Sequence, residues 1–81
     1  MNMNTNVDVV ITEAVIKRIK QVMEDKELTP YRVSKNANMN PRTLNSILSG
    51  VNKDIKISTL HNVCKGLGLT IKAFFDDEIF H

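Results

Sequence analysis

The chain has little of what would mark a secreted, disulfide-bonded or membrane protein. It has one cysteine, Cys64, so no disulfide can form within it and it has no cysteine-rich metal site. Tryptophan is absent, and aromatic residues make up 5% of the sequence. No apolar run approaches the roughly 20 residues that a membrane-spanning helix needs, and the polar segment 1–6 does not resemble a secretion signal. We therefore expect a cytoplasmic protein with no membrane segment.

Catalytic and cofactor-binding motifs are also missing. The sequence has no phosphate-binding loop, no dinucleotide fingerprint, no Ser/His/Asp set and no metal-ligand spacing. Its histidines, His61 and His81, lie far apart and have no partner cysteine. The acidic run Asp76-Asp77-Glu78 is interpreted as a solvated tail. We predict a protein that is not an enzyme and uses no cofactor or metal.

What the chain does have is room for one small domain and an uneven distribution of charge. It has 81 residues and a net charge of only +2, and a chain of this length forms a single domain. Segment 28–56 has one acid, Asp54, and five bases: Arg32, Lys35, Arg42, Lys53 and Lys56. The acidic run near the C-terminus contrasts with this basic middle. The pattern indicates a polyanion-binding face, although chance clustering on a solvated surface explains it equally well.

Apolar residues recur at steps of three and four, which predicts helices and an all-α fold class, a small bundle of about five helices. We expect Thr12 to cap a first helix that ends near Lys26. Residues 1–11 are interpreted as a flexible segment, 12–76 as the helical domain and 77–81 as a tail. Within the first segment, Val7–Ile11 is compatible with a strand, a helical turn or a partner-binding patch. The later helices are expected at 30–36, 41–48, 58–66 and 71–76.

Helix boundaries are marked by capping residues, prolines and glycines. Thr29-Pro30 and Asn40-Pro41 each place a good N-cap before a proline at the first helical position. Between them, Asn38 is the residue best able to adopt a left-handed backbone. Gly50 is expected to stop the helix that begins at Pro41. Further along, Thr70 is expected to cap the last helix, after Gly66 and Gly68 end the one before it.

Two short helices joined by a tight turn, over Leu28–Gly50, form the most informative unit. Small residues, Ser34 and Ala37, occur where the helices must approach closely, and the second helix keeps one face polar. These are the requirements of a helix-turn-helix, whose second helix enters the major groove of DNA.

The sequence resembles the phage repressor and Cro-like helix-turn-helix proteins, the XRE-type regulators. The resemblance covers roughly residues 13–75 and implies a lambda-repressor-like domain that binds double-stranded DNA. It departs from the family at the turn, where Asn38 replaces the usual glycine. Pro30 and Pro41 stand where the family commonly has polar residues, so one backbone contact and one base contact are lost. The matching positions are Ile16, Ile19, Leu28, Thr29, Val33, Ala37, Met39, Thr43, Leu44, Ile47, Gly50 and the segment 58–75 with its run 65–70.

Candidate DNA contacts fall into two groups. Arg42, Asn45 and Ser46 lie on one face at the start of the predicted recognition helix and are expected to contact bases. Tyr31 is expected to pack its ring between helices, the alternative being that its hydroxyl contacts a phosphate. Lys56 is a weaker backbone candidate. The predicted contacts to the DNA backbone are Arg32, Lys35, Asn40, Thr43, Asn52 and Lys53.

The C-terminal residues carry more apolar surface than one small core needs. Phe74 or Phe75 is expected to complete the core, leaving Ile79 and Phe80 for a contact surface. Since the last helix commonly forms the dimer in the resembled family, we expect a homodimer through the C-terminal helix and tail. The predicted function is a transcriptional regulator that acts as a repressor. Alternatives are an antitoxin-type module with a protein partner, or a helical domain that binds only protein.

Overall fold

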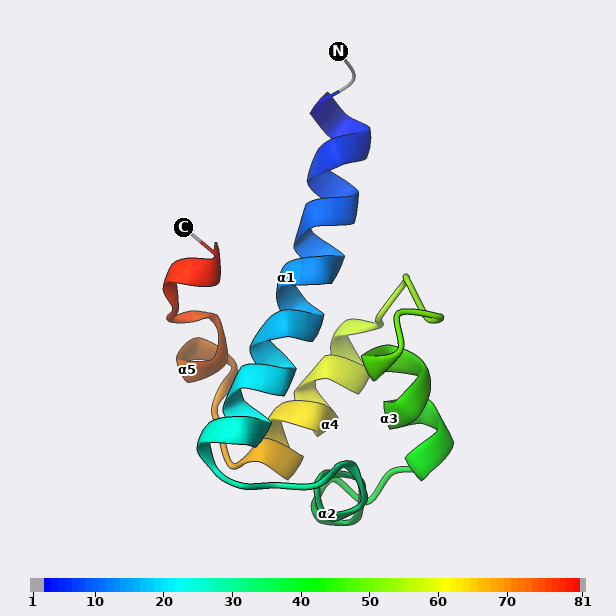
Figure 1. Ribbon diagram of the computed structural model, residues 1–81, viewed down its shortest axis with the longest axis vertical. Coiled ribbons are helices and arrows are strands. Elements are labelled where there is room, and N and C mark those ends of the chain that lie inside the picture. The colour runs from blue at the N-terminus through cyan, green and yellow to red at the C-terminus, as the bar shows by residue number, and fades with distance from the viewer. Residues whose placement is uncertain (1–2, 81) are drawn as a thin grey trace.

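The computed structural model describes residues 3–80, with side chains from residue 11 onward, and all regular structure among them is helical. The predicted all-α bundle of five helices is therefore confirmed (Figure 1). No helix in the described part of the chain is long and apolar enough to cross a membrane. The helices are α1 (Met3–Asp25), α2 (Pro30–Asn36), α3 (Pro41–Leu48), α4 (Ile57–Leu67), α5 (Ile71–Phe75) and the 3-10 helix η1 (Glu78–Phe80).

Helix α1 is longer than the sequence pattern predicted. It begins at Met3 and runs through Thr12, so the predicted cap at Thr12 is wrong. The segment between them contains neither proline nor glycine, and nothing in it forces a helix to stop. Of the readings left open for Val7–Ile11, the structure shows a helix. In Figure 1 this first part of α1 extends beyond the other helices, and the molecule measures 42 Å along its longest axis against 24 and 20 Å across.

The core is formed by one apolar face from each of the main helices. Helix α1 contributes the stripe predicted from its spacing, with Ile19 fully buried and Val15, Val22 and Met23 nearly so. The helices other than α1 contribute Val33, Leu44, Ile47, Leu60, Val63, Leu67 and Phe74.

Cys64 is also fully buried in this core. Burial raises the pKa of its thiol above the ordinary value, so this cysteine stays protonated, as expected for an inert core residue.

Helices α2 and α4 cross with their backbones nearly in contact at Gly66. A methyl group added there would lie 2.5 Å from the carbonyl oxygen of Val33 and 2.9 Å from Cβ of Ala37. Of the two glycines expected to end this helix, Gly68 is confirmed as its C-cap, in the left-handed conformation with φ of 76°, whereas Gly66 lies inside α4, which continues to Leu67. Gly66 is needed for the close crossing, and the predicted close-approach residues Ser34 and Ala37 are buried in α2 and its C-cap.

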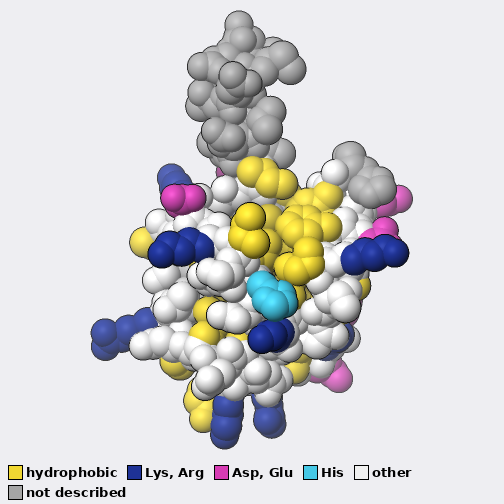
Figure 2. Space-filling view, turned by 180° about the vertical axis from the view of Figure 1, so that it is seen from behind, with side chains coloured by type: hydrophobic (Ala, Val, Ile, Leu, Met, Phe, Trp, Pro, Cys, Tyr) yellow, Lys and Arg dark blue, Asp and Glu magenta, His cyan; other side chains and the backbone are white. Residues whose placement is uncertain are grey.

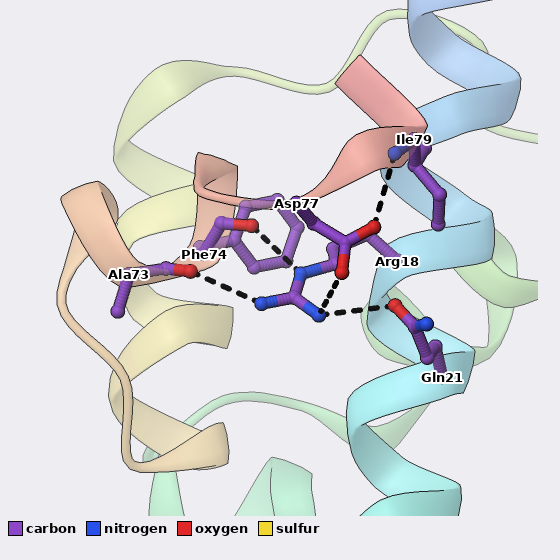
Figure 3. Close-up of polar contacts among 6 residues, drawn as sticks. All are labelled: Arg18, Gln21, Ala73, Phe74, Asp77 and Ile79. Atoms are coloured by element: carbon purple, nitrogen blue, oxygen red, sulfur yellow. Dashed lines mark hydrogen bonds and ion pairs between the residues drawn. The ribbon is translucent and has the colours of Figure 1, made fainter. Parts of the chain in front are cut away.

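Arg18 of α1 joins the C-terminal part of the chain to the body (Figure 3). Its Nε donates to the carbonyl of Phe74 at 2.7 Å, and its Nη2 donates to the carbonyl of Ala73 at 3.0 Å. Nη1 donates to Oε1 of Gln21 at 3.0 Å and forms an ion pair with Asp77 at 3.2 Å. One guanidinium therefore satisfies carbonyls at the end of α5 and fixes the segment that follows.

The interpretation of the whole acidic run as a solvated tail is wrong at Asp77. Besides pairing with Arg18, its other carboxylate oxygen accepts a hydrogen bond from the backbone N–H of Ile79 at 3.0 Å, which holds η1 in place. Phe80 then packs against Phe75, with ring centroids 4.8 Å apart. The tail therefore packs on the body. Phe80, which the sequence analysis assigned to a contact surface, spends part of its apolar surface on this internal contact.

The contact at Gly66 can be tested by adding one methyl group. Gly66→Ala is expected to lower the free energy of unfolding by about 3 kcal/mol, because the added carbon overlaps backbone that cannot move without separating α2 from α4. Gly50→Ala is the comparison, since nothing lies within 4 Å of its Cβ position and only its φ of 80° opposes the change. It should cost about 1–2 kcal/mol. Urea denaturation measures both, and an equal loss would contradict the steric explanation.

The Arg18 contacts can be tested in the same way. Arg18→Met keeps the length of the side chain but removes every donor, and it should cost about 2–4 kcal/mol because the carbonyls and Asp77 lose their partner. Lys20→Met on the exposed face of α1 is the matched control and should change stability by less than about 0.5 kcal/mol. If thermal and urea unfolding of the two variants coincide, the guanidinium does not hold the C-terminal segment.

Candidate DNA-binding surface

Helices α2 and α3 are joined by the turn that the sequence predicted. Thr29 caps α2, its Oγ1 accepting from the N–H of Arg32 at 3.1 Å. Asn38 takes the left-handed conformation with φ of 53°. The N–H groups of Asn38 and Met39 donate back to the carbonyls of Lys35 and Ser34. The chain therefore reverses tightly, and Met39 packs against the core as expected.

Helix α3 is capped by Asn40 and buries one face only. The Asn40 side chain accepts a hydrogen bond from the N–H of Arg42 at 2.8 Å. Leu44 and Ile47 are fully buried, which fixes the rotation of the helix about its axis. The opposite face therefore points away from the body.

The three predicted base contacts are not equally accessible on that outward face. Arg42 and Asn45 are exposed, whereas Ser46 is partly covered. The carbonyl of Ser46 accepts from the N–H of Asn52 at 3.1 Å, so the loop after α3 lies beside this residue. Thr43, a predicted backbone contact, is exposed one position along from Arg42.

The loop 51–56 is held by hydrogen bonds at Asn52 and Lys53. Asn52 is partly buried, and its side-chain oxygen accepts from the N–H of Asp54 at 3.1 Å. The carbonyl of Lys53 accepts from Oγ1 of Thr12 in α1 at 3.3 Å. The Lys53 side chain is exposed, so the backbone of this loop is anchored while its charged group faces solvent.

Helix α2 presents an aromatic and basic surface. Tyr31 is 65% exposed, so the prediction that it packs between helices is wrong. Ser34 and Val33 occupy the buried side of this short helix, and Tyr31 is left on the outside. The Lys35 ammonium lies 5.9 Å from the centre of the Tyr31 ring, a distance at which a cation and an aromatic face attract. Arg32 is exposed next to this pair.

All five basic side chains of segment 28–56 are exposed, and Asp54 is the one acidic residue among them. Helix α2, helix α3 and the loop 51–56 follow one another along one side of the molecule in Figure 1. Figure 2 shows Lys and Arg side chains projecting from the end of the body where α2 lies. The described residues contain no group of three or more His, Cys, Asp or Glu side chains that could hold a metal ion.

Helix α3 is short and capped, and it is buried on one face and polar on the other. A left-handed turn joins it to α2, a second short helix. This is the geometry of a helix-turn-helix that reads DNA. Comparison with known families agrees with it, since residues 18–78 match the model of the Cro/C1-type HTH DNA-binding domain. The chain belongs to this family. No curated protein and no solved structure matches the chain.

Sequence reasoning missed one residue on this side of the Cro/C1-type domain and misplaced another. Ser49, the C-cap of α3, is exposed, and its hydroxyl donates to the carbonyl of Ser46 at 3.2 Å. Its position seven residues after Arg42 and four after Asn45 was the available signal, because such residues share a helix face. Tyr31 is the misplaced residue, and its spacing of four from Lys35 was the signal for a pair on the outside of α2.

Proposed function

We propose that the protein is a sequence-specific transcriptional regulator of the cytoplasm that acts as a repressor, with α3 reading the major groove of double-stranded DNA. The observation that carries the proposal is the orientation of α3. Burial of Leu44 and Ile47 directs Arg42 and Asn45 outward from a capped, anchored helix. Repression requires only that the domain occupy its site and exclude other proteins from it, so no second activity has to be assumed.

The outward residues of α3 have side chains suited to base edges. Arg42 can donate two parallel hydrogen bonds to guanine, and Asn45 can donate to and accept from adenine. Each such pair contributes about 1–3 kcal/mol of discrimination against the wrong base. Ser46 is proposed as a third base contact, but it can reach only bases close to the helix because the loop covers part of it.

The proposed backbone contacts surround the reading helix. Their role is to set affinity and register, since phosphates carry no sequence information. Asn40 already uses its side-chain oxygen as the cap of α3, so its free amide hydrogens are what it can offer a phosphate. The proposed set is Arg32, Lys35, Asn40, Thr43, Asn52 and Lys53.

We further propose that the DNA-bound form is a homodimer. A two-fold dimer places two copies of α3 about 34 Å apart, one turn of DNA, on a pseudo-palindromic site. From the family resemblance, we expected the dimer contact to lie in the C-terminal helix and tail. Much of the aromatic surface of this region is buried internally, because Phe74 of α5 is at 0% exposure and Phe75 of α5 packs on Phe80 of the tail.

Base reading is tested by selecting bound sequences from random duplexes and measuring variants on the selected site. Arg42→Ala and Asn45→Ala should each weaken binding to that site by about 5- to 150-fold while affinity for an unrelated duplex changes much less, because base contacts provide discrimination. Both residues are exposed, so circular dichroism and thermal unfolding should match the parent protein. Lys20→Ala, on the exposed face of α1, is the control and should leave the preference intact. Equal loss on both duplexes would refute base reading by α3.

Phosphate contact makes a different prediction. Arg32→Ala and Lys35→Ala should weaken binding to selected and unrelated duplexes by the same factor. Each lost contact should also reduce the slope of log affinity against log salt by about 0.9 per bound protomer, since fewer counterions are released. Fluorescence anisotropy at several salt concentrations measures this. An unchanged slope would remove α2 from the DNA-binding surface.

A further inference from the structure

Val51, the second residue after the C-cap of α3, is an apolar side chain that the fold leaves in solvent. It is 78% exposed. An apolar residue at this position after a helix often packs back on the third residue from the helix end, but in α3 that residue is the polar Ser46. A single exposed apolar side chain is common on protein surfaces, so its meaning depends on where it is held.

The backbone on both sides of Val51 is fixed against α3. The N–H of Gly50 donates to the carbonyl of Ile47 at 3.1 Å. The N–H of Asn52 donates to the carbonyl of Ser46, also at 3.1 Å. Because valine is branched at Cβ, its side chain has few rotamers. The methyl groups of Val51 therefore have a defined place beside the end of α3, and a partner that buries them restricts little conformational freedom.

Val51 belongs neither to the hydrophobic core nor to the groove that lies between α1 and the loop 51–56. The residues of this part of the chain that line the groove are Gly50, Lys53, Asp54 and Ile55. In Figure 1 the loop continues the side of the molecule formed by α2 and α3. The direction left for the side chain of Val51 is outward, on the side that carries the proposed DNA contacts.

The C5-methyl group of thymine is the apolar group that base edges present in the major groove, and apolar side chains recognise it. The distance along the groove can be derived from the sequence separation. Val51 comes nine positions after Arg42, and a helix rises 1.5 Å per residue, so the two lie about 13 Å apart along the axis of α3. At 3.4 Å per base pair this corresponds to about four base pairs.

We propose that Val51 contacts the C5-methyl group of a thymine about four base pairs from the base read by Arg42, and that it is a specificity-determining residue. The proposal rests on the proposed function, because it requires α3 to lie in the major groove. It adds an apolar contact to a surface whose other proposed contacts are polar or charged. The expected consequence is a preference for thymine over cytosine at that base pair, since cytosine has no methyl group there.

The contact is tested with deoxyuridine, which differs from thymidine only by the missing methyl group. A site is selected from random duplexes, and each of its thymines is replaced in turn. For the parent protein, one replacement in a half-site should weaken binding about 3- to 5-fold, the effect of one methyl group lost from an apolar contact. Val51→Ala should bind the unmodified site at least about 3-fold more weakly than the parent, and the same replacement should then have little further effect.

Ile57→Ala is the matched control. Ile57 is an aliphatic residue with 83% exposure, but it lies at the start of α4, past the loop. This variant should remain as sensitive to the deoxyuridine replacement as the parent. Because both substituted residues are exposed, circular dichroism and thermal unfolding should match the parent protein, and fluorescence anisotropy measures the affinities.

Two results would overturn the proposal. One is a selected site with no thymine about four base pairs from the base that Arg42 reads, and the other is a deoxyuridine effect of equal size in the parent and in Val51→Ala. Either result leaves the proposed function in place if Arg42→Ala still loses discrimination. A parent protein that selects no sequence would instead refute the proposed function, and the Val51 contact with it.

Discussion

The position of the helix-turn-helix depends on the close crossing of α2 and α4. Helices α2 and α3 have only seven and eight residues, too few to be stable alone, so their place is set by what they pack on. At Gly66 the backbone of α4 lies against the carbonyl of Val33 and the methyl of Ala37 in α2 and its C-cap. Ser34 of α2 is buried there, and its hydroxyl donates to the carbonyl of Tyr31 at 2.8 Å, so its side chain is satisfied.

The remaining parts of the fold are tied to this crossing by a few charge-assisted contacts at helix ends. Lys26 donates to the carbonyl of Leu67 at 2.7 Å, which joins the end of α1 to the end of α4. Arg18 does the same for α5, with Asp77 completing the contact. Helix carbonyls at a C-terminus have no partner within the helix and carry partial negative charge, so a cation is well suited to them. Helix α1 thus orders the C-terminal half of the chain through its polar residues as well as its apolar stripe.

The sequence predicted the elements whose signals are local. Caps followed by prolines located α2 and α3 to the residue, because Thr29 and Asn40 act on the amide groups next to them. Errors arose where a distant part of the chain decides the outcome. In the sequence Gly66 has the character of a helix stop, but in the folded chain it allows α2 to cross α4. Asp77 likewise has the character of a solvated residue, but it pairs with Arg18, which is 59 positions away in the sequence. Spacing likewise predicted the outward face of α3, but only the folded loop reveals that Ser46 is half covered.

The proposed DNA-binding surface is fixed to the body through main-chain groups of its loop, which leaves its charged side chains in solvent. The carbonyl of Lys53 is bonded to Thr12 of α1, while the Lys53 side chain is exposed. The carbonyl of Ser46 accepts from the N–H of Asn52, so the loop 51–56 is also fixed against α3. Because these contacts use carbonyl and amide groups of the loop and of α3, the side chains of Arg42, Asn45 and Lys53 stay exposed. A loop that is held in this way adds its cation to the proposed DNA contact at a smaller cost in conformational entropy than a free loop would.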